Sequence, residues 1–336
     1  MAVIVRWPSV LPLTPTPPSP EDSSSGPPTD ITSNRSHIMT INSTSVTVLG
    51  LGRIGAALAE LFLRNGHPTT VWNRTPGKAD QLDGLGAQRA NSAEEAISAS
   101  ELIVIAGVDT ATAAALVSEV GEVVAGRDIL NVATGRPDQA RELASLVTEL
   151  GGRFLDGAIL GVPQTLGTTD TLFLYSGSPE AEQRHSETLA ELGTVNFLGA
   201  DAGLAGLHDM AVLAGMYGLF GGFFQAVAMV DSEGVGATTF TTDYLIPWLR
   251  SLLDLLPTLA AEIDSREFPV NFSDLAANRV GLDNIRTAAH NQGVSSELID
   301  PLQRLFDKQA ELGHGADSFT TAVSGLLTSG RPVGVH

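Results

Sequence analysis

The segment VTVLGLGRIG, residues 46–55, limits the possible folds of this chain more than any other segment. It begins as an apolar, strand-like run and then carries Gly50, Gly52 and Gly55 at the start of a stretch with helical spacing. Such glycines allow a tight turn, a close approach to the backbone and close packing of a helix on a strand. Further apolar runs of strand length alternate with helical segments as far as Gly199, which predicts a parallel, doubly wound α/β sheet of the Rossmann type.

The glycine pattern also predicts a loop that binds phosphate. A helix that starts directly after a strand offers backbone N–H groups and the positive end of its dipole to a bound pyrophosphate. The pattern is specific here because a strand precedes it, a helix follows it, and a second strand, TTVWN, comes next. We therefore expect a dinucleotide on this loop, in contact with Gly50, Leu51, Gly52, Arg53, Ile54 and Gly55.

The end of the second strand distinguishes between the two nicotinamide dinucleotides. A chain that binds NAD usually places Asp or Glu there to hold the ribose 2′-hydroxyl. This chain has WNRTPGK, in which Asn73 and Thr75 offer neutral donors, and Arg74 and Lys78 offer cations. Those groups suit a 2′-phosphate, so the sequence predicts NADPH rather than NADH as the cofactor.

The charge of the whole chain argues against polyanionic partners. Lys and Arg number 19 and Asp and Glu number 38, so the formal net charge is -19. A chain this acidic repels nucleic acid and anionic membranes, and neither is expected as a partner. The sequence contains no cysteine, which excludes disulfides and thiolate metal sites and is compatible with the cytoplasmic location that we expect. The seven histidines form no metal-binding pattern, and no metal is expected.

Composition divides the chain into four segments. Residues 1–42 are rich in Pro, Ser and Thr and are expected to form a disordered leader, with Met39 as an alternative start. The α/β pattern of residues 43–200 predicts the NADPH-binding domain. Residues 201–232 are expected to form one long apolar inter-domain helix, and residues 233–336 an all-α domain.

The predicted inter-domain helix is unusually apolar. It carries no charged residue between Asp209 and Asp231, and it is long enough to cross a membrane. However, it contains several glycines and Gln225, and no Lys or Arg flanks it, so we favour burial in protein. Burial of every face of one helix takes many neighbours, which suggests a partner subunit.

Asp209, near the start of this helix, is the best candidate for a group that acts on a substrate. Partial burial would raise the pKa of its carboxyl and let it serve as an acid or as the partner of a cation. Alternatively, Asp209 or Asp201 stabilises the first helical turn, and the spacing leaves both interpretations open. Tyr217, about two turns further along the same face, either donates a proton or packs.

Four stretches of the chain carry a family resemblance. They are VTVLGLGRIGAALAELFLRNGHPTTVWNRTPGKAD, DGAILGVPQTLGTTDTLFLYSGS, LGADAGLAGLHDMAVL and GHGADSF. Together they resemble the NADPH-dependent imine reductases and reductive aminases, a family related to the β-hydroxyacid dehydrogenases. The resemblance covers residues 45–330 and implies hydride transfer from NADPH to imines or iminium ions, with cyclic imines as expected substrates and reductive amination as a further option.

The comparison with β-hydroxyacid dehydrogenases gives Asp209 a chemical meaning. Those enzymes carry a catalytic lysine six residues after a glycine that corresponds here to Gly203, and the lysine position is Asp209 in this chain. An ammonium group would repel an iminium ion, whereas a carboxylate attracts it by on the order of a few kcal/mol in a site of intermediate dielectric. The exchange favours C=N chemistry, with Asp209 orienting or protonating the substrate nitrogen.

The resemblance also implies a domain-swapped homodimer. Each active site would form between the nucleotide domain of one chain and helices of the other, and the partner would cover the apolar helix. The substrate cleft is then expected to include Asp209, Tyr217, Trp248 and Asn278. Core packing is an equally open interpretation for Trp248. The residues expected near the nicotinamide are Val108, Thr134 and Val162.

Two other functions stay open on the sequence. The first is a β-hydroxyacid dehydrogenase-like oxidoreductase acting on C–O bonds, which the missing lysine opposes. The second is a non-catalytic NADPH-binding protein, which would bind NADPH through the Arg74 site and convert no substrate. His208 departs from the family pattern, and contact between it and Asp209 would lower the pKa of the Asp209 carboxyl.

Overall fold

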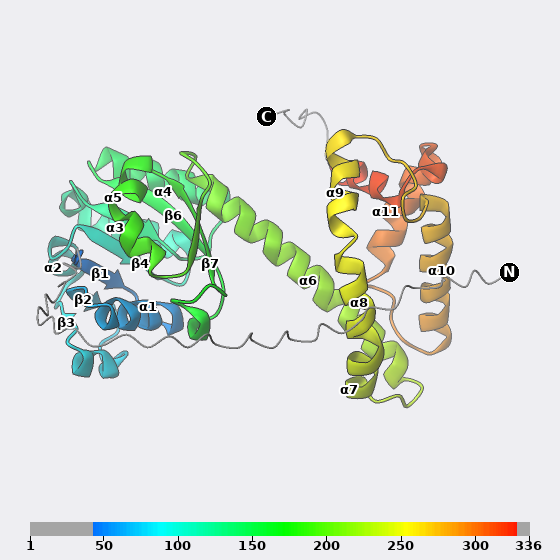
Figure 1. Cartoon of the computed structure of the whole chain (residues 1–336), viewed down its shortest axis with the longest axis horizontal. Helices are drawn as coiled ribbons and strands as arrows, with labels where there is room; N and C mark the ends of the chain where they lie inside the picture. Colours follow the sequence, from blue (N-terminus) through cyan, green and yellow to red (C-terminus); the bar gives the residue numbers. More distant parts are fainter. Residues whose placement is uncertain (1–42, 328–336) are drawn as a thin grey trace, which may run out of the picture. The chain divides into compact units, whose positions relative to one another are not determined.

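The computed structural model describes residues 43–327, and the expected leader at 1–42, together with Met39, lies outside them (Figure 1). An eight-stranded sheet with the strand order β3-β2-β1-β4-β5-β6-β7-β8 dominates the first part. Its strands are β1 Val46–Leu49, β2 Thr69–Trp72, β3 Gln88–Arg89, β4 Leu102–Ile105, β5 Asp128–Asn131, β6 Arg153–Leu160, β7 Leu172–Gly177 and β8 Thr194–Phe197. The order of the first strands, with the crossover between β1 and β4, is that of a Rossmann-type sheet.

Two strands, β7 and β8, depart from the parallel sheet that the sequence predicts. β7 runs antiparallel to β6 and β8 pairs parallel with β7, whereas β1 to β6 run parallel to one another. The connection between β6 and β7, residues 161–171, holds only the short 3-10 helix η3, Pro163–Thr165. A parallel partner would need a crossover of a dozen or more residues, so this short connection returns the chain in the opposite direction.

Helices cover both faces of the sheet (Figure 1). They are α1 Arg53–Arg64, α2 Ala93–Ser98, α3 Thr110–Val120, α4 Pro137–Glu149 and α5 Pro179–Ala190, with the 3-10 helices η1 Asp80–Leu85 and η2 Gly121–Val124. On one face, α1 and α5 pack onto a core that includes Phe62 and Tyr175. On the other, α2, α3 and α4 pack onto a core that includes Ile103 and Phe154. The four-residue β1 and β4 are buried throughout, as expected of central strands.

The long helix α6, Gly203–Asp231, begins against the sheet. Asp201 Oδ1 accepts a hydrogen bond from the Gly203 N–H at 3.0 Å, and the same carboxylate pairs with Arg141 of α4 through two bonds of 2.8 Å. The Ser176 hydroxyl on β7 accepts from the Ala205 N–H and donates to the Ala202 carbonyl. These bonds fix the start of α6 against α4 and β7.

Further along, α6 is largely exposed in the single chain. It is the one helix among the described residues that is long and apolar enough to cross a membrane, and 6% of its most apolar window is buried. Its exposed apolar side chains include Leu219, Phe220 and Phe224, the last with 60% of its surface exposed. The neighbours that the sequence requires for burial are therefore not supplied by the described part of this chain.

The remainder of the described chain, up to residue 327, is helical, as the sequence predicts. The α-helices are α7 Ala237–Phe240, α8 Ile246–Leu253, α9 Leu256–Ser265, α10 Leu275–Asn291 and α11 Asp300–Glu311, with η4 Thr241–Leu245, η5 His314–Ala316 and η6 Phe319–Leu326 between and after them. Leu275, Phe306 and Ala322 form the core of this part. Glu262 of α9 is buried and accepts hydrogen bonds from Ser318 and Thr320, which ties α9 to the start of η6.

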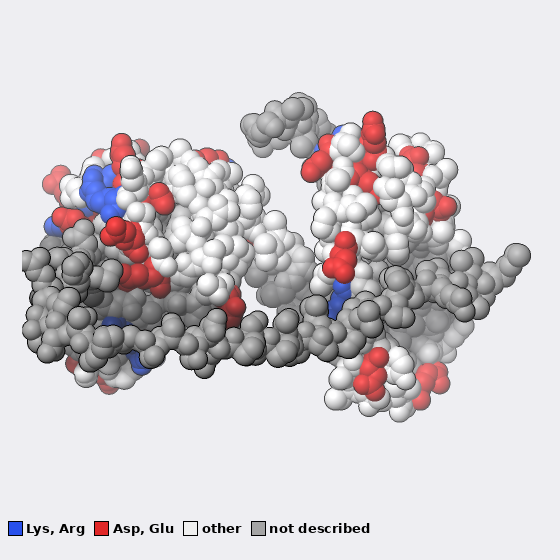
Figure 2. Space-filling view, viewed as in Figure 1, with Lys and Arg blue, Asp and Glu red and all other residues white. Residues whose placement is uncertain are grey.

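The surface reflects the acidic composition. Figure 2 shows carboxylates distributed over the visible face, with Lys and Arg in small separate groups. The described residues visible on this face therefore form no continuous basic surface of the kind that nucleic-acid binding requires.

Candidate active site

The glycine loop between β1 and α1 has the geometry of a phosphate-binding turn. Gly50 has φ +97°, and a Cβ there would lie 2.5 Å from the Ala106 carbonyl oxygen. A Cβ on Gly55 would lie 1.8 Å from the Gly50 carbonyl oxygen, so only glycine lets α1 approach β1 this closely. By contrast, a Cβ on Gly52 would have no atom within 4 Å. The missing Cβ of Gly52 thus leaves open space beside the first turn of α1, whose N–H groups have no partners within the helix.

The loop after β2 contributes the cations. Asn73 Oδ1 accepts from the Leu51 N–H at 2.8 Å, and Asn73 Nδ2 donates to the Thr75 carbonyl at 2.8 Å. The Asn73 amide therefore holds the glycine loop and its own turn together, a structural task that the sequence interpretation did not assign to it. Arg74 and Lys78 are exposed and line the adjacent pocket, with their charges free to meet a phosphate.

A cavity of about 680 Å³ runs along this edge of the sheet. It is lined by the whole glycine loop, Asn73, Arg74 and Lys78, and on the other side by residues of β4, of α3 and of the loop between them, including Val108. Thr75 lies on the same turn without lining the cavity. The cavity fits a dinucleotide that carries a 2′-phosphate. It has open space at Gly52 and the N–H groups of the first turn of α1 for the pyrophosphate, and the cations Arg74 and Lys78 for the 2′-phosphate.

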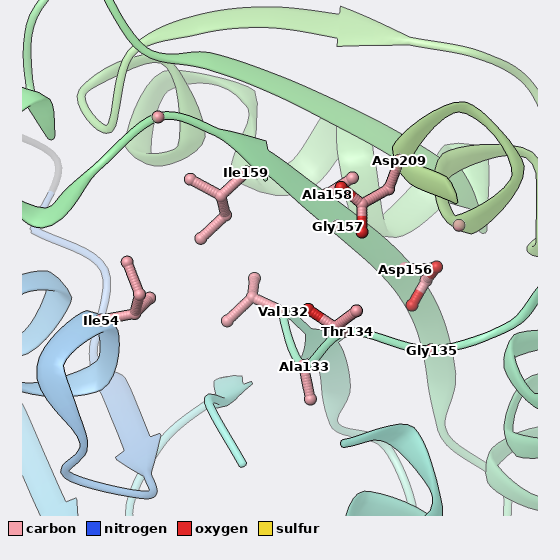
Figure 3. A pocket seen from close by; sticks show the side chains of 12 residues that line it. Ile54, Val132, Ala133, Thr134, Gly135, Asp156, Gly157, Ala158, Ile159 and Asp209 are labelled. Carbon is pink, nitrogen blue, oxygen red and sulfur yellow. The ribbon is translucent and has the colours of Figure 1, made fainter. Parts of the chain in front are cut away.

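A second cavity, of about 170 Å³, adjoins the first, and Ile54 lines both. Its walls come from the loop after β5, including Thr134, from the end of β6, and from Gly206 and Asp209 of α6 (Figure 3). Asp209 reaches from α6 toward β6 in this view. Parallel strands place ligands at their carboxyl ends, and this cavity lies at the carboxyl end of β5.

Asp209 is half-buried, and burial raises the pKa of its carboxyl. It stands in the second turn of α6, while Asp201 is the residue that bonds the first turn, so the helix-start alternative applies to Asp201. His208 is exposed, and its Nδ1 bonds the Leu204 carbonyl at 2.8 Å. The carboxyl of Asp209 therefore lies at the pocket wall, and its role as an acid or as the partner of a cation stays a prediction.

A second carboxyl in this pocket escaped the sequence interpretation. Asp156 of β6 is 5% exposed and lies opposite Asn131 of β5, whose Nδ2 donates to Asp156 Oδ1 at 2.8 Å. Its signal in the sequence was a lone charged residue inside the apolar strand FLDGAIL. A buried carboxyl in such a run must have partners, and polar groups of this kind gather at functional sites.

The other predicted substrate residues lie outside both cavities in the described chain. Tyr217 and Trp248 are 66% and 53% exposed. Asn278 is half-buried, and its amide donates to Ser273 Oγ and to the Asp274 carbonyl at the start of α10. Val162, expected near the nicotinamide, is 52% exposed at the start of η3. Their roles in substrate binding stay predictions.

Metal ligands do not gather in residues 43–327: no group of three or more His, Cys, Asp or Glu side chains there could hold an ion.

Comparisons with known proteins cover both parts of the chain. Residues 201–328 match the model of the NADPH-dependent reductive aminase-like C-terminal domain, and residues 45–200 match that of the NAD binding domain of 6-phosphogluconate dehydrogenase. The chain is 37% identical to the NADPH-dependent reductive aminase of Aspergillus oryzae over 83% of this chain and 95% of that protein.

Solved structures extend the comparison. A reductive aminase from Aspergillus terreus in complex with NADPH and ethyl levulinate is 40% identical, with a TM-score of 0.80 over 85% of this chain and all of that one. The imine reductase of Streptomyces aurantiacus is 30% identical, with a TM-score of 0.80 over 84% of this chain and all of that one. A relative this similar over nearly its whole length shows the family, and the chain belongs to the NADPH-dependent reductive aminases and imine reductases.

Proposed function

We propose that this protein reduces imines and iminium ions to amines with NADPH, including imines formed in the site from a ketone and an amine. The observation that carries the proposal is the position of Asp209, a half-buried carboxylate on the wall of a cavity that adjoins the cofactor cavity. A carboxylate there suits a cationic C=N substrate better than a neutral carbonyl.

The chain's own residues provide binding, orientation and charge. Bound NADPH supplies a hydride for the substrate carbon. The glycine loop and the first turn of α1 would hold the pyrophosphate, and Arg74 and Lys78 would pair with the 2′-phosphate. Ile54 lines both cavities and Thr134 lines the second, so both would lie beside a substrate that approaches the bound cofactor.

Asp209 acts at the substrate nitrogen. With its raised pKa it holds a proton more readily than an exposed aspartate, so it can protonate an imine nitrogen and then pair with the iminium ion as a carboxylate. The apolar walls of the cavity, including Val132, Ala158 and Ile159, strengthen that pairing and exclude water that would hydrolyse the imine.

Ketone and amine partners are proposed by analogy with the relatives. One solved relative is described as a reductive aminase in complex with cyclohexanone and allyl amine, and another as an imine reductase in complex with dibenz[c,e]azepine. The same Asp209 carboxyl would serve loss of water from a carbinolamine, because that step also needs a proton donor beside the departing oxygen.

The proposal includes a domain-swapped homodimer. The exposed apolar surface of α6, with Tyr217, Phe220 and Phe224, exceeds what an isolated helix in water tolerates, and a second copy of the chain would cover it. The partner's helices would then complete the substrate cavity with Tyr217 and Trp248. Sedimentation should give twice the chain mass of 35.0 kDa, and a stable monomer that retains full activity contradicts this part of the proposal.

One assay tests the activity. Purified protein with NADPH and a five- or six-membered cyclic imine should consume NADPH, while hydroxy acids with NADP should give no turnover. The reverse pattern would indicate a C–O oxidoreductase, and NADPH binding without turnover of either class would indicate a non-catalytic protein.

Asp209→Asn tests the residue assignment. It should lower kcat by about 100-fold, a typical contribution of a positioned acid, and leave the affinity for NADPH unchanged. Asp264→Asn, an exposed carboxylate on α9, is the matched control and should behave as wild type. Equal rates in wild type and Asp209→Asn would remove Asp209 from the mechanism.

A further inference from the structure

Asp156 is a buried carboxyl beside the reaction cavity, and the chemistry proposed above does not use it. The backbone of Gly206 on α6 hydrogen-bonds its carboxylate, and a Cβ on Gly206 would lie 3.5 Å from Asp156 Oδ2. Asp209 follows one turn later on the same helix. Both carboxyls line the same cavity, Asp156 from β6 below and Asp209 from α6 above (Figure 3).

Burial is the main reason that the pKa of Asp156 rises to about 7, and the charge of Asp209 adds to the effect. The bonds from Asn131 and Gly206 favour the ionised form, but burial outweighs them. A carboxyl with this pKa changes its charge near neutral pH, within the range in which most enzymes work.

The other charged groups on the elements around Asp156 are engaged elsewhere. On α4, Arg136 pairs with Asp138, and Arg141 pairs with Asp201. On α6, His208 bonds a backbone carbonyl. The residues directly opposite Asp156 on the neighbouring strands are the neutral Asn131 and Ser176, whereas Asp128 lies at the other end of β5, where it pairs with Arg153. Among the described residues, Asp209 is therefore the charged neighbour that acts on Asp156.

The geometry points to Asp156 as a second acid of the reaction cavity, coupled to Asp209: its ionisation changes the cavity from one negative charge to two and tightens the binding of a cation. This inference rests on the proposed function, because it takes the occupant to be an iminium ion or a protonated amine. With Asp156 neutral, the single charge of Asp209 balances one iminium. With Asp156 ionised, a second carboxylate attracts the cation and slows the release of a protonated amine product.

The coupling between the two carboxyls can be tested without substrate. Infrared difference spectra of the purified protein should show a protonated carboxyl that titrates near pH 7 and is lost in Asp156→Asn. In Asp209→Asn the midpoint of that band should fall by about one pH unit, because a neighbouring negative charge has been removed. Asp264→Asn should leave the midpoint unchanged. An unchanged midpoint in Asp209→Asn overturns the coupling, and this comparison does not depend on how Asp156→Asn folds.

The effect on cation binding needs a probe whose own charge does not change. N,N-dimethylpyrrolidinium, a quaternary cyclic cation, can be titrated calorimetrically into the protein with NADP⁺ between about pH 6 and pH 8. Wild type should bind it several-fold more tightly at the higher pH, and Asp156→Asn should bind it equally at both. The same pH dependence in wild type and Asp156→Asn overturns the inference. Absence of binding at every pH contradicts the proposed substrate class instead, and the infrared result then decides the coupling alone.

Discussion

Gly55 and Gly52 stand three residues apart in one loop, yet the structure predicts opposite consequences for the same substitution. A Cβ on Gly55 would lie 1.8 Å from the Gly50 carbonyl oxygen and 3.0 Å from the Ala106 Cβ. The first contact is with backbone, so α1 and β1 would have to move apart by more than an ångström. Overpacking of this kind costs about 3 kcal/mol, which corresponds to a fall in Tm of about 6 to 12 °C for a domain of this size.

Gly52→Ala is the matched control for folding and the test for the cofactor. Gly52 has φ -72° and a Cβ there meets nothing within 4 Å, so the variant should melt within about 2 °C of wild type. Its methyl group would enter the space assigned to the pyrophosphate and weaken NADPH binding about tenfold or more, the equivalent of about 1.4 kcal/mol. Thermal melts and fluorescence titration with NADPH measure both effects.

The two glycine variants refute different parts of the reasoning. A Gly55→Ala protein that melts as wild type would contradict the close packing of α1 on β1. A Gly52→Ala protein that binds NADPH as wild type would contradict the position of the pyrophosphate, whatever its stability.

Two more predictions address charge. Arg74→Ala should weaken NADPH binding by about 10- to 100-fold and NADH binding much less, because it removes a charge-assisted contact to the 2′-phosphate. Arg64 is an exposed arginine at the end of α1, and Arg64→Ala is the control. Equal losses of affinity for both cofactors in Arg74→Ala would refute the assignment of Arg74 to the 2′-phosphate. At the opposite end of β5, burial disfavours the charge of Asp128, but hydrogen bonds from His185 and Arg153 outweigh it and hold the pKa of that carboxyl below its ordinary value. Asp128→Asn should therefore cost about 3 kcal/mol near neutral pH. Because the pKa of Asp128 is lower in the folded than in the unfolded protein, the stability that its charge contributes is present above the unfolded pKa of about 4 and is lost as pH falls through the folded pKa. The Tm values of wild type and Asp128→Asn should therefore converge in acid. A difference in Tm that stays constant with pH would refute the ionic origin of this stability.

The sequence predicted the elements that carry strong patterns. Hydrophobic periodicity identifies β1 with its glycines, the strands β4 and β5, and the long apolar α6. The two-residue β3 and the short α2 were missed, because neither is long enough to show a period. The antiparallel direction of β7 was not predicted for another reason: strand direction depends on the length of the connection, and strand composition does not report it.

Asp209 and Asp156, the two acids of the reaction cavity, differ in how far the sequence predicts them as site residues. Asp209 could be predicted because a charge at the head of an apolar helix is conspicuous, and because related enzymes place a lysine at that position. Asp156 is three strands away from the glycine loop along the sheet order and 53 residues before Asp209, and the two meet only because α6 begins against β6. That approach depends on Gly206, where a Cβ would lie 3.2 Å from the Gly135 carbonyl oxygen. The residues that allow Asp156 and Asp209 to approach, Gly206 and Gly135, are therefore small and uncharged. Their packing couples the two carboxylates, and no local sequence pattern predicts that packing.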